Sequence, residues 1–308
     1  MKTVDVSIII INYNTLNLTK NCIQSIRNNT KNVSYEIILV DNASPDRSGD
    51  ILEKWTSEST DIIFIKSNKN LGFGRANNLA YKQTSGKYIF LLNSDTILLN
   101  NAIKIFKDSM SALPEKYVCL GSPLLERDKK TIGPSSGEFP TIKKLVKQKF
   151  KRTLSHIGII KSYQYKYHFE KPITIVDYVI GADLFIRREV IEKLGLFDND
   201  FFMYSEETEM QFRYNKNGFI SAIIKGPEII HLTPKIEAGK EKYSCINRYL
   251  FYEGHFTYLK KRYSFIPYLL YRMFFFITNF HQPFITKGTI MQKIQFFLLI
   301  FGLKTIKH

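Results

Sequence analysis

Short apolar runs alternate with amphipathic segments along the first third of the chain. The runs are rich in isoleucine, leucine and valine, as expected of strands buried on both faces of a parallel sheet. These predicted strands are residues 4–11, 35–40, 62–65 and 88–92. The segments between and after them have apolar positions at helical spacing and predict helices at residues 16–26, 48–55, 73–82 and 100–110. Strands that alternate with helices indicate βαβ units, so we expect an α/β fold with a mostly parallel sheet.

The pattern changes twice in the rest of the chain. Residues 125–172 are rich in glycine, proline and serine and then in lysine, and they predict a loop and helix inserted on the face of the sheet. Regular structure resumes at residues 173–187 and continues with predicted helices at residues 188–194 and 206–217 and a strand at residues 219–224. Residues 241–308 hold 18 of the 43 aromatic side chains, in apolar runs that polar residues interrupt.

The net charge of +16 is concentrated in two segments. Residues 141–172 hold nine Lys and Arg against one acid, and residues 241–308 hold ten against two. Such patches occur in nucleic-acid binders and in proteins that lie on anionic membranes. No nucleic-acid-binding motif accompanies them, so we expect a membrane surface and no nucleic acid as partner. The apolar runs after residue 241 are shorter than the ~20 residues that span a bilayer, and two alternatives stay open: helices lying in the membrane interface, or a helical cap on the main domain.

If these last helices lie on a membrane, the cationic side chains should meet lipid headgroups and the aromatic side chains should insert shallowly. The side chains expected at the headgroups are Lys260, Lys261, Arg262 and Arg272, and those expected to insert are Tyr263, Phe265, Phe274 and Phe275. The three cysteines lie far apart without a CxxC pair, which fits a reducing compartment rather than a disulfide framework. The N-terminal apolar run is too short for a signal peptide, so we expect a cytoplasmic protein, peripheral on the inner face of the cell membrane.

Polar side chains stand where the predicted strands end. Asn12 and Asn14 follow the first strand, Asp41 the second, and Asn93 and Asp95 the fourth. Ligands of open α/β sheets bind beyond the carboxyl ends of the strands, so we expect the binding site at this edge. A carboxylate such as Asp95 can hold a divalent cation that bridges a diphosphate. The alternative for such an aspartate is a turn or a helix cap.

A glycine-containing loop precedes the third predicted helix. Residues 70–78, NLGFGRANN, read GxGxxN rather than GxGxxG, and they follow the third strand rather than the first. This placement argues against a dinucleotide-dependent hydride transfer. The loop can still present backbone amides and Arg75 to a phosphate.

Three acids open the predicted helix at residues 206–217. Glu206, Glu207 and Glu209 all stand in its first turn, where acids are favoured by the helix dipole. Glu209 is also spaced for an ordinary surface ion pair with Arg213. Glu206 and Glu207 follow an aromatic run, so we expect at least one of them to face a cleft.

The ordered set of motifs resembles glycosyltransferase family 2, in particular its rhamnosyltransferase-like branch, over about residues 4–235. The motifs that carry the resemblance are VSIIIINYN at 6–14, ILVDNAS at 38–44, NLGFG at 70–74, LLNSD at 91–95, GADLFIRR at 181–188, Phe197-Asp198 and EETE at 206–209. The resemblance implies a GT-A fold with a Rossmann-like nucleotide-sugar-binding sheet, and a C-terminal helical extension would follow it. It also implies an inverting, metal-dependent glycosyltransferase that takes its sugar from a nucleotide-diphosphate donor.

The resemblance further implies a role in bacterial surface polysaccharide synthesis, such as O-antigen, capsule or cell wall glycan. We expect a rhamnosyl-, galactosyl- or glucosyltransferase that acts on a lipid-linked or glycan acceptor. The alternative function is a non-catalytic nucleotide-sugar-binding or scaffold protein of the same fold. We expect a GT-A catalytic domain at residues 1–240, with a nucleotide-sugar-binding half at 1–124 and an acceptor half at 125–240. Residues 241–308 would form the helical membrane-associating or capping region.

Roles follow from the resemblance position by position. Asp41 matches the acid that contacts the nucleotide base, and Asp95 matches the last acid of the DxD-type motif that binds Mg²⁺ or Mn²⁺ with the diphosphate. His231 stands where relatives carry a histidine near the metal or phosphate. Glu207 matches the general base, beside Glu206. The remaining residues expected to contact the donor are Asn12, Tyr13, Asn14, Asn70, Gly72, Gly74, Arg75, Asn93 and Ser94, and Asp183 is expected to read a sugar or acceptor hydroxyl.

Overall fold

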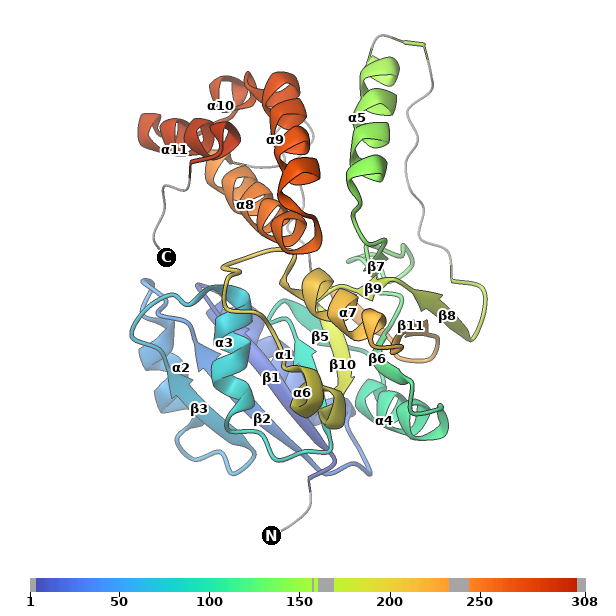
Figure 1. Cartoon of the computed structure of the whole chain (residues 1–308). Coiled ribbons are helices and arrows are strands. Elements are labelled where there is room, and N and C mark those ends of the chain that lie inside the picture. Colours follow the sequence, from blue (N-terminus) through green and yellow to red (C-terminus); the bar gives the residue numbers. More distant parts are fainter. Residues whose placement is uncertain (1–3, 157, 160–168, 233–243, 304–308) are drawn as a thin grey trace. The chain divides into compact units, whose positions relative to one another are not determined.

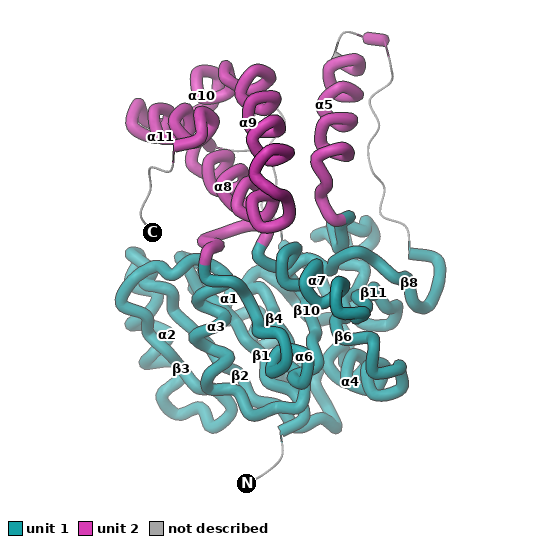
Figure 2. The backbone as a smooth tube through the Cα atoms, viewed as in Figure 1, with its two compact units in different colours: residues 1–138, 167–199, 206–233 teal, residues 139–166, 200–205, 234–308 magenta. Residues whose placement is uncertain are grey.

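The structure is a computed structural model that describes residues 4–156, 158–159, 169–232 and 244–303. The chain forms two compact units (Figure 2). The first, which we call the sheet unit, comprises residues 1–138, 167–199 and 206–233. The second, the helical unit, comprises residues 139–166, 200–205 and 234–308.

The sheet unit is built on an eight-stranded sheet with the order β3-β2-β1-β4-β10-β6-β11-β8 (Figure 1). Its strands are β1 (Val6–Asn12), β2 (Tyr35–Asp41), β3 (Ile62–Lys66), β4 (Tyr88–Leu92), β6 (Tyr117–Gly121), β8 (Ile173–Val176), β10 (Asp183–Arg187) and β11 (Ile220–Ile224). The first four pair in parallel, as do β6 and β11, whereas β10 and β8 run antiparallel to their neighbours. Two small sheets pair β5 (Thr96–Leu98) with β12 (Ile229–His231) and β7 (Ser136–Gly137) with β9 (Tyr178–Val179).

Helices cover both faces of this sheet. They are α1 (Leu16–Asn29), α2 (Ser48–Thr56), α3 (Gly72–Tyr81), α4 (Ala102–Ala112), α6 (Arg188–Leu194) and α7 (Glu206–Lys216). Side chains of α1, α2 and α4 join the core on one face, and those of α3, α6 and α7 join the core on the other. The predicted fold class, an α/β fold with a mostly parallel sheet flanked by helices, is confirmed.

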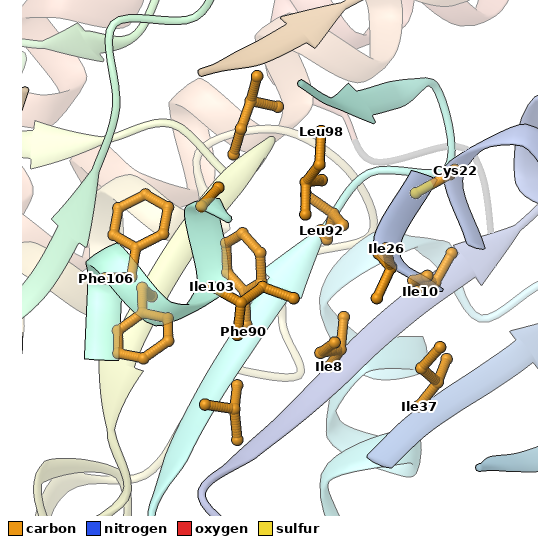
Figure 3. Close-up of a cluster of buried hydrophobic side chains, with 14 of the residues drawn as sticks. Ile8, Ile10, Cys22, Ile26, Ile37, Phe90, Leu92, Leu98, Ile103 and Phe106 are labelled. Carbon is orange, nitrogen blue, oxygen red and sulfur yellow. The ribbon is translucent and has the colours of Figure 1, made fainter. Parts of the chain in front are cut away.

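The alternation of strand side chains divides the core into two layers. Ile8 and Ile10 of β1 belong to the first cluster, shown in Figure 3, whereas Ile9 between them belongs to the second. In the first cluster the rings of Phe106 and Phe185 stack with centroids 5.4 Å apart. Truncating such a fully buried phenylalanine to alanine typically costs about 3–5 kcal/mol. This two-sided packing fixes the strands, and therefore the positions of the residues at their carboxyl ends.

The helical unit contains α5 (Ile142–His156), α8 (Cys245–Arg262), α9 (Phe265–Asn279), α10 (Gln282–Ile285) and α11 (Ile290–Phe301). Aromatic rings hold α8, α9 and α11 together: Tyr252 stacks on Phe296 at 5.9 Å, and Phe256 meets Phe275 edge-on at 4.9 Å. Within the described residues, none of the helices has the length and apolarity that crossing a bilayer requires.

Two expectations for the helical unit are wrong. Arg272 does not reach outward to headgroups: it is 9% exposed, lies 3.7 Å above the Phe256 ring, and donates to the Leu299 and Ile300 carbonyls. Phe275 is 6% exposed and packs inside the unit. Both stand on the face of α9 that turns to α8 and α11, which the broken apolar pattern of the sequence does not reveal.

Candidate functional site

The site lies at the carboxyl edge of the four parallel strands. Asn12 ends β1 and pairs in register with Asp41, which ends β2. Asn93, Ser94 and Asp95 follow β4, the other neighbour of β1. The backbone N–H of Asn93 donates to the Ala182 carbonyl just before β10. The predicted convergence of polar strand ends is therefore present in the structure.

Asn12 is the hub of a buried hydrogen-bond network. Its Nδ2 donates to Asp41 Oδ1 at 2.7 Å, to Ser48 Oγ at 2.9 Å and to Ser44 Oγ at 3.1 Å. Ser44 also donates to the same carboxylate, from its Oγ at 2.6 Å and from its backbone N–H at 3.1 Å. Asn12 and Asp41 are 0% and 2% exposed, so their side chains hold the edge together rather than open onto it.

The network extends from β1 to the end of β4. The Oδ1 of Asn12 accepts hydrogen bonds from Thr19 Oγ1 at 2.8 Å and from Thr15 Oγ1 at 3.0 Å. The Thr15 hydroxyl also lies 3.0 Å from the Ser94 hydroxyl, next to Asp95. Six side chains thus form one unit, which we call the Asn12 network: Asn12, Thr15, Thr19, Asp41, Ser44 and Ser48. Together with Ser94 it links the ends of β1, β2 and β4.

A second amide fixes the glycine loop against β2. Asn42 donates to Asn70 Oδ1 at 3.0 Å and to the Gly72 carbonyl at 3.1 Å, and it accepts from the Leu71 N–H at 2.9 Å. Gly72 has a φ of +77°, which an L-residue rarely adopts. A Cβ on Gly74 would lie 3.1 Å from the Phe197 Cβ, so this glycine allows close packing. Asn70, Gly72 and Gly74 therefore shape the loop through their backbone and their contacts.

Asp95 and His231 come together across the small β5–β12 sheet. The pairing places His231 opposite Thr96, the residue after Asp95. His231 Nε2 lies 3.3 Å from Asp95 Oδ1, and the Leu232 N–H donates to the Asp95 carbonyl at 2.8 Å. The two side chains are 18% and 23% exposed, so both remain accessible.

These two side chains fit a divalent cation of the Mg²⁺ or Mn²⁺ kind. A carboxylate oxygen and an imidazole nitrogen converge on one accessible point, and both are ligands that Mn²⁺ accepts. In the part of the chain that the structure describes, no three His, Cys, Asp or Glu side chains gather as a metal-binding group. A metal here would therefore need its remaining ligands from water or from the donor's phosphates, as Mg²⁺ often does.

The two adjacent glutamates open α7. Glu206 is 3% exposed, and its Oε2 has no hydrogen-bond partner among the described residues. Burial raises the pKa of Glu206, and the neighbouring charge of Glu207 raises it further. Burial also raises the pKa of Glu207, while backbone N–H groups of the first turn counteract this. Because two close carboxyls resist ionising together, the more buried Glu206 keeps its proton to higher pH than Glu207.

The backbone just before these glutamates is strained. Tyr204 and Ser205 have φ values of +70° and +68°, in the left-handed region that non-glycine residues avoid. Each such residue costs on the order of 1–3 kcal/mol and is typical of functional sites. Glu209, by contrast, forms an ordinary pair with Arg213 at 3.2 Å, as the spacing predicted.

Asp183 is fully enclosed at the start of β10. Its Oδ2 accepts from the Ser122 N–H at 2.7 Å and from the Ser122 hydroxyl at 2.6 Å, while its Oδ1 has no partner among the described residues. Burial raises its pKa to about 7, against the lowering by the Ser122 hydrogen bonds and the charge of His231. At 0% exposure the carboxyl is out of reach of a sugar in this structure, and contact with a hydroxyl stays a prediction.

The structure directs Arg75 away from the other residues that were predicted to bind the donor. Arg75 Nε donates to the Asn199 carbonyl at 2.9 Å, on the side of α3 that faces the loop after α6. Tyr13 is 41% exposed, and Asn14 has a φ of +56° with its N–H donating to Ser44 Oγ. Tyr13 and Asn14 are therefore the residues after β1 that a ligand could touch.

Sequence reasoning missed five hydroxyl side chains that hold this edge: Thr15, Thr19, Ser44, Ser48 and Ser122. Each is a small hydroxyl residue in the loop after a strand or in the first turn of a helix. Such residues are commonly helix caps or turn residues, which hid their role. Their placement within seven residues of a strand end was the signal that the sequence offered.

Known proteins with similar sequences are glycosyltransferases. A low-salt glycan biosynthesis hexosyltransferase of Haloferax volcanii is 28% identical over 236 residues, which cover 75% of this chain and 68% of the relative. An uncharacterized glycosyltransferase of Methanocaldococcus jannaschii is 28% identical over 240 residues, covering 75% of this chain and 78% of the relative.

Solved structures confirm the GT-A fold. The mannosyltransferase of Pyrobaculum calidifontis, in complex with GDP-Man and Mn²⁺, aligns with a TM-score of 0.57 and 14% identity over 99% of this chain and 77% of its own. Staphylococcus aureus TarS 1–349, in complex with UDP-GlcNAc, aligns with a TM-score of 0.54 and 14% identity over 97% of this chain and 72% of its own. At this identity the likeness shows the fold alone. The sequence model of glycosyl transferase family 2 matches residues 7–195, more than half of the chain, and the chain belongs to this family.

Proposed function

We propose that this glycosyltransferase is metal-dependent and inverting, and that it transfers a hexose from a nucleotide-diphosphate sugar to an acceptor hydroxyl in surface polysaccharide synthesis. The convergence of Asp95 and His231 at 3.3 Å, beside the Asn12 network, carries the proposal. A carboxylate and an imidazole, both side chains that can bind a metal, thus lie at the edge where α/β sheets bind ligands. The hexosyltransferase relative and the structures with GDP-Man and UDP-GlcNAc support a sugar nucleotide as donor.

The donor would lie across the ends of β1, β2 and β4. Tyr13 and Asn14 would line its nucleotide side, with the buried Asp41 positioning that loop through Ser44. The diphosphate would approach Asn93, Ser94 and Asp95. Bound Mg²⁺ or Mn²⁺, held by Asp95 and His231, would offset the negative charge of the departing diphosphate.

Glu207 would act as the general base and Glu206 as its neutral neighbour. A proton that stays on buried Glu206 leaves Glu207 as the carboxylate that can accept the acceptor's proton. A base with a raised pKa works best because its pKa approaches the operating pH. With Glu207 taking that proton, the acceptor oxygen attacks the anomeric carbon from the side opposite the leaving diphosphate, and the configuration inverts.

Three matched glutamine variants on α7 test this assignment. Glu207→Gln should bind donor like the wild type and lose roughly 10²-fold or more in turnover, the usual contribution of a general base. Glu206→Gln should retain most of its activity because a neutral amide replaces a neutral acid. Glu209→Gln, on the same helix but paired with Arg213, is the control and should stay within a few-fold of wild type. A large loss in Glu206→Gln with full activity in Glu207→Gln would exchange the two roles.

A matched substitution at the strand end tests the metal. Asp95→Asn removes one charge from the pair with His231 and should weaken Mn²⁺-dependent nucleotide binding, measured by calorimetry with and without chelator. Wild-type activity that is unchanged in excess chelator would refute metal dependence. Retained donor binding without any transfer, in the wild-type protein and with every acceptor tried, would favour a binding or scaffold role instead.

We further propose that residues 1–240 act as the catalytic domain and that residues 241–308 hold it on an anionic membrane, at the cytoplasmic face. Large apolar side chains on α9 to α11 are open to solvent, among them Phe265 at 73%, Ile266 at 67% and Ile290 at 79% exposure. Soluble proteins rarely expose so many apolar side chains on neighbouring helices. Together with the basic residues of this segment, they fit an interfacial position.

A further inference from the structure

A groove in the helical unit lies between α5, α8 and α9 and has a volume of about 270 Å³. Lys149 and Arg152 of α5 line one side. Tyr252 of α8 and Phe274 of α9 are among the aromatic side chains on the other sides. Figure 2 shows α5 in the same unit as the other two helices. None of the residues lining the groove is an aspartate or glutamate.

The charged amine of Lys149 at this groove is hydrogen-bonded to neutral oxygens rather than to carboxylates. Lys149 Nζ donates to the Thr278 carbonyl at 3.0 Å and to Asn279 Oδ1 at 2.9 Å. Burial and the charge of Arg152 both lower the pKa of Lys149, so the two cations are close enough to repel. The whole of α5, KKLVKQKFKR in its central part, contains six basic residues and no acid. Two neighbouring cations on a groove whose lining holds no carboxylate favour a bound anion, because an opposite charge offsets their mutual repulsion.

A third cation is close on the α8 side. Arg248 donates to Gln282 Oε1, but its buried Nε has no hydrogen-bond partner among the described residues. The charges of Arg248 and Arg152 both act on the hydroxyl of Tyr252, whose pKa burial raises. The groove therefore receives positive charge from two helices.

Apolar side chains flank the cations. Phe150 of α5 is 60% exposed, and its ring centroid lies 6.1 Å from that of Phe274. Phe251 of α8 lines the groove and is 48% exposed, and Leu154 of α5 is 37% exposed. A free inorganic anion gains nothing from such surfaces, whereas a hydrocarbon chain attached to the anion buries them at roughly 25 cal/mol per Å².

We propose that this groove binds a phosphate-bearing lipid, with the phosphate at Lys149 and Arg152 and the start of the hydrocarbon chain along Phe150 and Phe274. The volume of about 270 Å³ holds a phosphate and the first carbons of the chain, and the rest of the chain stays in the membrane or micelle. The inference rests on the proposed function in one respect: it identifies the carrier of the lipid-linked acceptor as a lipid phosphate.

Calorimetric titration of the full chain with farnesyl phosphate, in non-ionic detergent and without donor, tests the site. Farnesol lacks the anion and inorganic phosphate lacks the chain, and both should bind at least tenfold more weakly than farnesyl phosphate. Arg152→Gln, at an exposed position, and the double variant Lys149→Gln with Arg152→Gln should each weaken binding, the double variant at least tenfold. The matched control is Lys143→Gln with Lys147→Gln, which removes the same charge from exposed positions of α5 outside the groove and should bind within twofold of wild type.

Equal losses in the two double variants would show a diffuse charge effect and overturn the site. Equal binding of farnesol and farnesyl phosphate would overturn the anion, and equal binding of inorganic phosphate would overturn the lipid. If the double variant loses helicity, Arg152→Gln decides, since Arg152 has no hydrogen-bond or ion-pair partner among the residues that the structure describes. Glu207→Gln should bind farnesyl phosphate like the wild type, so failure of the catalytic assignment would leave this result unchanged.

Discussion

Replacing Asp183 by asparagine should change how the stability of the sheet unit depends on pH. Burial raises the pKa of this carboxyl to about 7, from 3.8 for an exposed aspartate. The folded state therefore holds the proton more tightly than the unfolded state does. The stability that this proton provides is complete below pH 3.8, falls as the pH rises, and is lost above the folded pKa of about 7. Asparagine carries no titrating proton, so the variant lacks this dependence.

The expected magnitude follows from the two pKa values. Each pKa unit corresponds to about 1.4 kcal/mol, so about three units predict that wild-type stability falls by about 4 kcal/mol relative to the variant between pH 4 and pH 8. The slope is about 1.4 kcal/mol per pH unit between these limits. An asparagine oxygen can still accept from Ser122, so the Ser122 bonds should not dominate the comparison.

Urea unfolding followed by Trp55 fluorescence measures this, because Trp55 is the single tryptophan and lies on α2 of the sheet unit. Chelator in all samples keeps metal ions from the neighbouring His231. The control is Asp128→Asn, an exposed residue whose pKa is lowered to about 2 by the Thr131 hydroxyl and nearby backbone N–H groups. The stability that this lowered pKa provides is complete above pH 3.8. The difference in stability between wild type and Asp128→Asn should therefore be constant from pH 5 to 8. A constant difference between wild type and Asp183→Asn over that range would refute the reasoning.

Three further outcomes follow from the site and the exposed helices. Because burial raises the pKa of Glu207 above the ordinary 4.5 and a base must be ionised, turnover at saturating donor should begin to fall at a pH above 4.5; a rate that stays constant down to pH 4.5 would contradict this. In Gly49→Ala the new Cβ would lie 2.5 Å from Asp41 Oδ2, so urea unfolding should show a loss of about 1–3 kcal/mol together with weaker donor binding. In liposome flotation, Ile277→Asp on α9, 66% exposed in the wild type, should reduce binding to anionic vesicles several-fold, whereas Ile175→Asp on β8, 61% exposed, should not; equal binding by both variants argues against a membrane role for α9.

The strands of the first hundred residues were predictable because they are buried on both faces. A run such as Ile8 to Ile10 has no polar face that could suggest another structure, and β4 begins and ends at the predicted residues. The short strands β5, β6 and β12 were not predicted. They depend on partners far along the chain, as Thr96 depends on His231, and no local pattern marks such pairs.

In the candidate site, too, the sequence predicted the features that have a local signal and not those that depend on distant residues. The polar residues at the strand ends were found because their position after a buried strand is a local signal. The direction of a side chain is set by tertiary contacts instead. Arg75 donates to the Asn199 carbonyl, and Arg272 packs against the Phe256 ring. The sequence had predicted instead that Arg75 contacts a phosphate and that Arg272 contacts lipid headgroups. The burial of Asp183 likewise depends on Ser122, a residue 61 positions away.

The Asn12 network restricts how this protein can be altered to accept other donors. One buried amide satisfies Asp41 and Ser48 on one side and Thr15 and Thr19 on the other. Replacing Asn12 leaves buried donors and acceptors on both sides unpaired, at a cost of about 1–3 kcal/mol each, so this position can vary only together with its partners. An attempt to change the sugar nucleotide should therefore leave the network intact. It should begin at the exposed side chain of Tyr13, whose replacement would alter the proposed donor-binding surface without disturbing the strand ends beneath it.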